Sequence, residues 1–175
     1  YHALQALSDH SNLTIVDKRL DWNNVTFVPY LHDHLQFPKQ TNEICIAHQT
    51  FVGVDYGYMR PEVGVDAGAV SAEVIISGHI HMRQSFGKVI YPGTPYAQSV
   101  NDIDQIKGVM LFDTETYEQT FFECPLPKWR SLKYEMSSDL NISSIHQDLQ
   151  GTITPNNHWV ISITGPRAEI TAYRD

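Results

Sequence analysis

The chain of 175 residues is predicted to have a mixed α/β fold, and three features of the sequence support this. Short apolar runs that end in glycine or in polar clusters are typical of buried strands. In the first part of the chain, longer segments separate these runs, as in alternating strand and helix units. From Lys107 onward one strand-like run follows another directly, which favours an antiparallel second half and hence a sheet sandwich.

The expected elements follow the chain in order. Helices are predicted over residues 1–7 and 142–149, and strands over 13–16, 25–30, 43–48, 74–76, 88–91, 107–113, 117–124, 129–136 and 158–164. The two strands on either side of residues 114–116 are expected to form a β-hairpin. The segment Pro125-Leu126-Pro127 indicates a boundary, so residues 1–127 are expected to form one domain and residues 128–175 the start of a second.

Composition and charge exclude some classes of protein. The hydrophobic content of 42% is that of a globular protein, and no apolar run has the length of a transmembrane helix. We therefore expect a cytoplasmic protein without a membrane partner. A net charge of −8 argues against a broad basic surface for nucleic acid, although bound metal ions can supply positive charge locally. Cys45 and Cys124 lie in apolar runs and are expected to be buried free thiols in a reducing compartment.

Three histidines are the main candidates for chemistry. His79 and His81 follow the predicted strand 74–76 and Gly78, and His48 ends another apolar run. In extended backbone, side chains at i and i+2 point to the same side, and open α/β sheets hold ligands beyond the carboxyl ends of their strands. Imidazoles brought together from different strand ends are typical of a metal site. The sequence therefore indicates a metal centre at one edge of a sheet.

This centre is incomplete within the sequence. A bare pair of histidines at i and i+2 is more often solvated than metal-bound. No carboxylate cluster is visible that would complete a shell for two cations, because Asp33 and Asp55 fall in predicted loops. We expect the remaining ligands to lie upstream of Tyr1. A zinc site formed by Cys45 and His48 is disfavoured, because an offset of three places them on opposite faces of a strand.

Other polar groups have two explanations each. His32 and His34 form a second pair at i and i+2, in a loop where exposure to solvent is the ordinary state. The basic segment 128–133, with a tryptophan between its charges, could contact nucleic acid or could be the charged outer face of a strand. The turn at Gly93-Thr94 could offer backbone N–H groups to a phosphate, or it could simply join two strands.

Three motifs resemble those of a known family. They are AHQ at residues 47–49, SGHIH at 77–81 and YPGTPYAQS at 91–99. Together they are similar to the calcineurin-like metallophosphoesterase superfamily, and most similar to its SbcD-type branch. That branch contains the nuclease subunits of double-strand-break repair complexes and phage recombination nucleases. The family has five motifs, DxH, GDxxD, GNHD, a lone His and GHxH, and this sequence contains the last two.

The resemblance implies a fold and a site. The fold would be the C-terminal half of a metallophosphoesterase four-layer β-sandwich over residues 1–127, followed from residue 128 by part of a small α+β capping domain. The site would hold two divalent metal ions, usually manganese, with His48 and His79 as ligands to one ion and His81 as a ligand to the other. The catalytic histidine belongs to the GNHD motif and is expected upstream of Tyr1, so this chain alone is expected to be inactive.

The resemblance also implies partners and leaves alternatives open. The whole protein would be a dimetal DNA exonuclease or endonuclease that hydrolyses phosphodiester bonds, a homodimer, and a partner of an SbcC-type ATPase subunit. One alternative is another branch of the superfamily, a phosphatase or a cyclic-nucleotide phosphodiesterase. The other is a binding module that keeps the fold without the active site. The tail after Pro127, which is similar to a cap, favours the nuclease.

Overall fold

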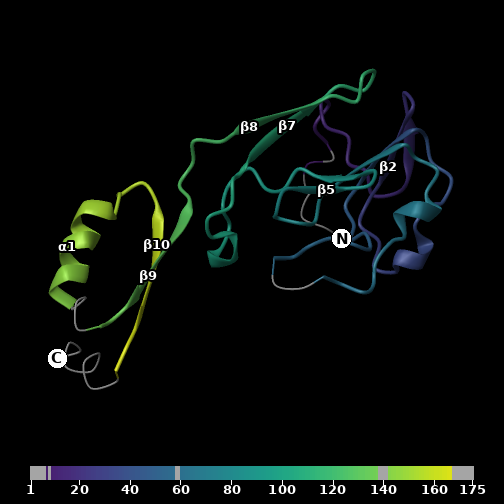
Figure 1. The fold of residues 1–175 in the computed structure, drawn as a ribbon. Helices are drawn as coiled ribbons and strands as arrows, with labels where there is room; N and C mark the ends of the chain where they lie inside the picture. Colours follow the sequence, from purple (N-terminus) through teal and green to yellow (C-terminus); the bar gives the residue numbers. More distant parts are fainter. Residues whose placement is uncertain (1–6, 8, 58–59, 138–141, 167–175) are drawn as a thin grey trace. The chain divides into compact units, whose positions relative to one another are not determined.

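The computed structural model describes residues 7, 9–57, 60–137 and 142–166 (Figure 1). The chain divides into two compact units, Tyr1–Thr94 with Gly108–Phe122, and Pro95–Lys107 with Glu123–Asp175. Strands predominate, and α1 (Ile142–Thr152) is the only α-helix among the described residues. The fold is therefore mixed α/β, as the sequence predicts. In the described part of the chain, no helix has both the length and the apolar character needed to cross a membrane.

The first unit is built on a six-stranded sheet. Its strands are β1 (Leu20–Trp22), β2 (Val25–Val28), β3 (Ile44–Ala47), β4 (Val74–Ser77), β5 (Gln84–Phe86) and β6 (Val89–Tyr91). The order is β1-β2-β3-β4-β6-β5, with β2, β3, β4 and β6 parallel and the two edge strands antiparallel to their neighbours. Because the four central strands run in one direction, their carboxyl ends meet at a single edge of the sheet.

The two faces of this sheet are covered to different degrees. Cys45, Ile75 and Val89 align across three strands, and all three are fully buried in the main core. On the opposite face, Ile46 aligns with Ile76, and Ile46 is 36% exposed although it lies on a central strand. Successive side chains of a strand point to opposite faces, so the sheet has one packed face and one apolar face that is only partly covered.

The long glycine-rich segment after β3 packs against the core. Phe51 and Val54 are fully buried, and Val65 is nearly so. An isolated bridge joins Phe51 to Val65. Two short 3-10 helices, η2 (His34–Gln36) and η3 (Ala67–Ala69), complete the connections between strands. The carboxylate of the residue that precedes each of them, Asp33 and Asp66, accepts a hydrogen bond from its first turn.

A β-hairpin belongs mainly to the first unit. Its strands are β7 (Gly108–Phe112) and β8 (Gln119–Glu123), which form a separate two-stranded sheet, as predicted. The guanidinium of Arg83 lies 4.2 Å from the centre of the Phe121 ring, a cation–π contact with the loop between β4 and β5. The Tyr117 hydroxyl donates to the Glu43 carboxylate at 3.4 Å. These two contacts hold the hairpin to the unit.

The second unit is a small βαβ arrangement. The strands β9 (Trp129–Glu135) and β10 (His158–Thr164) pair in parallel along their whole length, and α1 lies in the connection between them (Figure 1). Ile145 of α1 and Met136 after β9 are buried. The same unit contains η4 (Val100–Asp102), which has a capping box between Ser99 and Asp102.

The structure differs from the predicted elements in a few places. Residues 13–16 form no strand, whereas the short edge strands β1 and β5 were not predicted. An isolated apolar run becomes a strand only where a neighbour pairs with it, and edge strands of three residues have too few side chains for a visible period. Most of the predicted helix 1–7 lies outside the described residues.

Candidate metal centre

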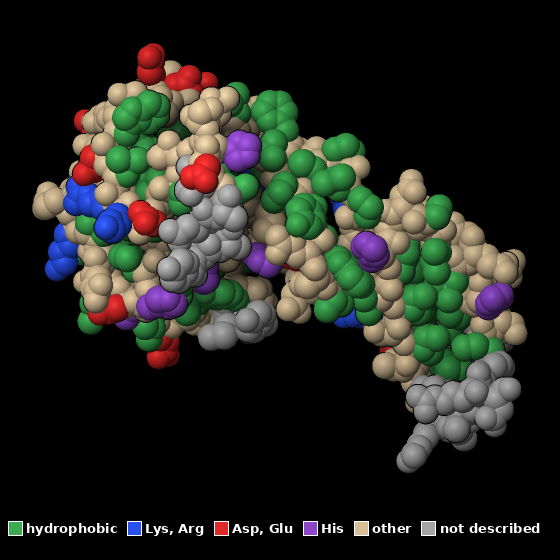
Figure 2. All heavy atoms as spheres, turned by 180° about the vertical axis from the view of Figure 1, so that it is seen from behind, with side chains coloured by type: hydrophobic (Ala, Val, Ile, Leu, Met, Phe, Trp, Pro, Cys, Tyr) green, Lys and Arg blue, Asp and Glu red, His purple; other side chains and the backbone are tan. Residues whose placement is uncertain are grey.

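Two of the predicted site residues meet at the carboxyl edge of the sheet. His48 follows β3 directly, and His79 follows β4 by two residues. Their ring centroids lie 5.4 Å apart with the rings at 81°, an edge-to-face arrangement. Figure 2 shows histidine side chains gathered at the surface of the first unit. The parallel pairing of β3 with β4 produces this juxtaposition, because it aligns the ends of the two strands.

The backbone at His79 differs from the prediction. We expected extended backbone, but His79 has a φ of +80°, in the left-handed region that residues other than glycine rarely adopt. The turn begins at Gly78, whose N–H donates to the carbonyl of Ala47 at 2.9 Å. A Cβ at Gly78 would lie 2.6 Å from Nδ1 of His48. The absence of a side chain at Gly78 therefore lets the His48 ring lie against this turn.

The third predicted ligand, His81, lies in the loop that follows β4. Its charge lowers the pKa of His79, which shows that the two residues are electrostatically coupled. Among the described residues, no group of three or more His, Cys, Asp or Glu side chains could hold a metal ion. The structure thus brings His48 and His79 together, while the ligand roles of His48, His79 and His81 stay predictions.

The two paired imidazoles favour their neutral form. Partial burial lowers the pKa of His48. The pKa of His79 is lowered first by partial burial and then by repulsion from His48 and His81. Both side chains also keep exposed surface, so a ligand can reach them. Neutral imidazole is the form that binds metal ions, and two of them fit part of the ligand set of a divalent first-row metal.

Sequence reasoning missed Tyr30 as a member of the site. Its ring stacks on that of His79, with centroids 5.4 Å apart and an angle of 23° between the planes. It also lies edge-on to His48 at 6.4 Å and to His32 at 5.2 Å. Its place in the sequence could have identified it. Tyr30 follows β2 by two residues, and because β2 pairs in parallel with β3, the residues after both strands lie at the same edge of the sheet.

A buried network of hydrogen bonds links the strand ends that carry these rings. The Gln49 backbone N–H donates to the Ser77 hydroxyl at 2.9 Å, and the Gln49 carbonyl accepts from the Ser77 and Tyr91 hydroxyls at 3.0 and 2.8 Å. The Gln49 side-chain amide donates to the carbonyl of Leu31 at 2.8 Å. Burial raises the pKa of Tyr91 to about 12, so this hydroxyl stays protonated. The network connects the carboxyl ends of β2, β3, β4 and β6.

The turn after β6 supports the loop that contains His81. The N–H of Thr94 donates to the carbonyl of His81 at 3.2 Å. Gly93 has a φ of +79°, and a Cβ there would lie 2.8 Å from the same carbonyl. Of the two explanations of this turn, a structural one therefore has direct support, because the Thr94 amide is bonded within the protein.

The basic segment after residue 127 is largely neutralised within its own unit. The Lys128 ammonium forms an ion pair with Glu123, and the Arg130 guanidinium lies 3.7 Å from the Asp104 carboxylate. The Trp129 ring packs on that of His158, with centroids 4.9 Å apart. These contacts fit a strand with a charged outer face.

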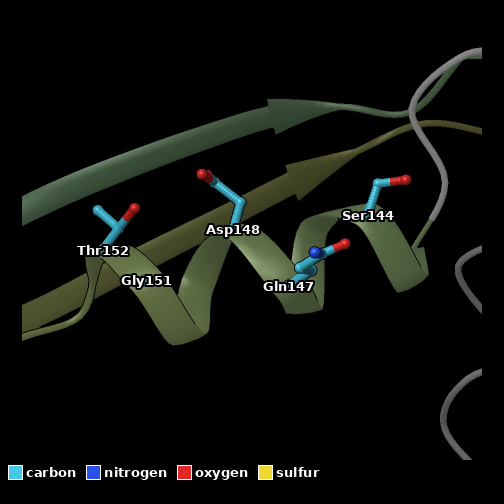
Figure 3. A pocket seen from close by; sticks show the side chains of 5 residues that line it. All are labelled: Ser144, Gln147, Asp148, Gly151 and Thr152. Carbon is cyan, nitrogen blue, oxygen red and sulfur yellow. The ribbon is translucent and has the colours of Figure 1, made fainter.

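A groove in the second unit lies along one side of α1. It has a volume of about 530 Å³ and is lined by Ser144, Gln147, Asp148, Gly151 and Thr152, which share one face of the helix (Figure 3). Asp148 is the ionisable side chain among these five, and it accepts a hydrogen bond from the Tyr134 hydroxyl at 2.5 Å. The groove thus lacks a cluster of groups for catalysis.

Comparison with known proteins assigns no family to the chain: no protein-family model matches it, and neither does any curated protein. The functional assignment consequently depends on the geometry of the carboxyl edge and on the motifs that form it.

Proposed function

We propose that this chain provides part of the dimetal centre of a metallophosphoesterase, and that the whole enzyme is an SbcD-type nuclease acting on DNA phosphodiesters. The observation that supports this most directly is the contact between His48 and His79. These residues belong to the AHQ and SGHIH motifs, and both follow neighbouring parallel strands of one sheet. Open α/β sheets hold their ligands at this edge.

The partly covered face of the sheet also supports the proposal. Ile46 is exposed on a central strand, and Val109, Leu111 and Phe122 of the hairpin are each at least half exposed. Apolar sheet faces of this kind are normally covered by another layer. A four-layer β-sandwich, of which residues 1–127 would form the C-terminal half, would supply such a layer. Residues 128–175 would then begin the capping domain.

In this proposal each histidine has a role. His48 and His79 would bind one divalent cation as neutral imidazoles, and His81 would bind the second. The three family motifs that this sequence lacks would have to supply the other ligands and the catalytic histidine. Two divalent cations, manganese in the family, supply the positive charge that stabilises a phosphodiester during hydrolysis. In this proposal the histidines of this chain would bind and orient the cations, and proton transfer would fall to the catalytic histidine of the GNHD motif.

The partners in this proposal are DNA, an SbcC-type ATPase subunit and a second copy of the whole protein. The net charge of −8 and the ion pairs of Lys128 and Arg130 leave little free positive charge in the segment predicted to be basic. Attraction of the DNA backbone would then depend strongly on the bound cations. The same observation favours a second candidate, a phosphatase or phosphodiesterase of the same superfamily with a small substrate.

The experiment compares this chain with the full-length product of its gene. Manganese-dependent hydrolysis of labelled duplex DNA, single-stranded DNA and bis-p-nitrophenyl phosphate is measured for each, with and without His79→Ala. His146→Ala, an exposed histidine on α1, is the matched control. We expect DNA cleavage by the full-length protein, at least about a hundredfold loss with His79→Ala, and no change with His146→Ala.

Other outcomes discriminate between the candidates. Hydrolysis of the small diester without cleavage of DNA would favour the phosphatase or phosphodiesterase branch. Absence of activity on every substrate, together with absence of manganese binding, would contradict the proposal and indicate a binding module.

A further inference from the structure

Tyr30 combines high exposure with a defined ring contact. The residue is 48% exposed, so its ring is only half covered by the first unit. Its contacts are nevertheless with the histidines of the carboxyl edge, stacked on His79 and edge-on to His48. An aromatic pair of this kind stabilises the folded protein by more than its buried apolar area alone would give.

The imidazole of His79 is attached to a backbone that residues other than glycine rarely adopt. It follows Gly78, and its φ is +80°. The stacked ring of Tyr30 and the edge-to-face ring of His48 are its aromatic neighbours among the described residues. His48 would be a ligand itself, so Tyr30 is the ring available to hold His79 in place without binding the metal.

The segment that contains Tyr30 is held in turn by a hydrogen bond from a buried side chain. The side-chain amide of Gln49, a residue only 3% exposed, donates to the carbonyl of Leu31 at 2.8 Å. The backbone of the same residue is bonded to Ser77 at the end of β4. Gln49 therefore ties the residue next to Tyr30 to the strand that leads to His79, and it is the chain neighbour of His48.

We propose that Tyr30 is a positioning residue of the metal centre: its ring fixes the imidazole of His79, and the buried amide of Gln49 fixes the segment that carries Tyr30. This inference rests on the proposed function, since it takes His79 to be a metal ligand. It adds a residue that none of the family motifs found in this sequence contains. Without the ring, His79 would have to lose rotamer freedom when the metal binds, which weakens binding.

The experiment uses the full-length protein, in which the other motifs would supply the remaining ligands, with Mn²⁺ alone as the probe and the NMR signals of the histidine rings as the readout. In the metal-free protein, the ring current of Tyr30 shifts the ring protons of His79. During a Mn²⁺ titration, paramagnetic broadening of the same signals gives the dissociation constant. The variants are Tyr30→Ala, Tyr30→Phe and His79→Ala. Trp22→Ala is the control, because Trp22 is 62% exposed on β1, opposite the first residue of β2.

The positioning role predicts a specific pattern. Tyr30→Ala should abolish the ring-current shift of His79 and raise the dissociation constant for Mn²⁺ about fivefold. Tyr30→Phe keeps the stacking ring and should behave as the wild type in both measurements. Trp22→Ala should change neither. A merely structural role would leave the affinity for Mn²⁺ unchanged in Tyr30→Ala, although the ring-current shift is lost.

Two outcomes overturn the inference, and they are distinguishable. If His79→Ala prevents Mn²⁺ binding but Tyr30→Ala binds as tightly as the wild type, Tyr30 does not position the ligand, and the proposed function stands. If the wild type shows no Mn²⁺ broadening at His48 or His79, the proposed function fails for this chain, and the positioning role fails with it.

Discussion

At the scale of single residues, the site depends on what surrounds each imidazole more than on the histidines themselves. His79 has left-handed backbone, the adjacent Gly78 leaves room for the His48 ring, and Tyr30 stacks on His79 from the end of β2. Each of these contacts joins residues from different strand ends. Small substitutions beside the histidines should therefore change the site with little effect on the core.

Gly78→Ala tests this directly. The new Cβ would lie 2.6 Å from Nδ1 of His48, so the imidazole must turn away. Because this ring is the end of an exposed side chain, the free energy of unfolding should fall by no more than about 1 kcal/mol. Affinity for Mn²⁺ should fall about tenfold, because the ligand is displaced. Urea denaturation and Mn²⁺ titration are the measurements.

The matched control for this substitution is Gly151→Ala. A Cβ at Gly151 meets nothing within 4 Å, and alanine favours the helix. This variant should be as stable as the wild type or slightly more stable, with unchanged affinity. A Gly78→Ala protein with wild-type affinity would show that His48 does not need its observed position.

At the scale of elements, the loop between β4 and β5 is held by the turn that follows β6. The carbonyl of His81 accepts from the N–H of Thr94, and Gly93 approaches the same loop closely. The SGHIH and PGTP motifs therefore form one structural unit, although ten residues lie between them in the sequence. The segment 95–107 has a comparable local anchor in the ion pair of Asp102 with Lys107.

Gly93→Ala should destabilise the first unit. Its φ of +79° is costly for alanine, and the new Cβ would lie 2.8 Å from the His81 carbonyl oxygen and 2.9 Å from the Arg83 nitrogen. Both are backbone atoms, so the loop itself has to move. We expect the free energy of unfolding to fall by about 2 kcal/mol or more, measured by urea denaturation. Stability equal to that of the wild type would mean that the loop does not rest on this turn.

The Asp102–Lys107 pair predicts a dependence of stability on pH. Burial raises the pKa of Asp102, but hydrogen bonds from the Lys107 ammonium and from the Gln98 and Ser99 N–H groups outweigh it and hold the pKa below 3.8. Because the folded-state pKa is depressed, this contribution is complete above pH 3.8 and is lost as the pH falls through the folded-state value.

The measurement compares Asp102→Asn with the wild type by urea denaturation. At pH 7 the variant should be about 3 kcal/mol less stable, because it leaves a buried ammonium without its carboxylate. This difference should shrink as the pH falls below 3.8. Asp17→Asn, an exposed position, is the control and should show no such difference. A difference that is constant with pH would contradict the assigned ion pair.

At the scale of the whole molecule, the two units have cores of their own. The first is organised by the packed face of the six-stranded sheet, and the second by α1 on β9 and β10. Each unit contains one cysteine, Cys45 in the first and Cys124 in the second, and both are free thiols. Cys45 is therefore a natural probe for the unfolding of the first unit.

Cys45 should resist thiol reagents until the first unit unfolds. It is fully buried, and burial raises its pKa to about 11, so both access and the thiolate are suppressed. In a Cys124→Ser background at pH 8, we expect the labelling rate in buffer to be at least about a thousandfold below that in denaturant. Rapid labelling of the native protein would show that the core around β3 opens without global unfolding.

Much of the fold could be predicted from local sequence. The buried strands β3, β4 and β6, the hairpin and β10 appear at their predicted places, because runs of apolar residues bounded by turn residues have few other solutions. The edge strands β1 and β5 were missed, since each has three residues and its pairing depends on its neighbour. The free thiols were predicted, and Cys45 is buried, whereas Cys124 is only partly covered.

The sequence alone therefore determined that histidines lie at the ends of strands in this protein, because the periodicity of apolar residues and the glycine turns are local properties of the chain. It also indicated that His48 and His79 would share an edge, since parallel strands align their carboxyl ends. Only the tertiary structure decided the left-handed backbone of His79, the stacking of Tyr30 and the buried bonds of Gln49. These features join residues that are far apart in the chain, and no local pattern specifies which distant side chains will meet.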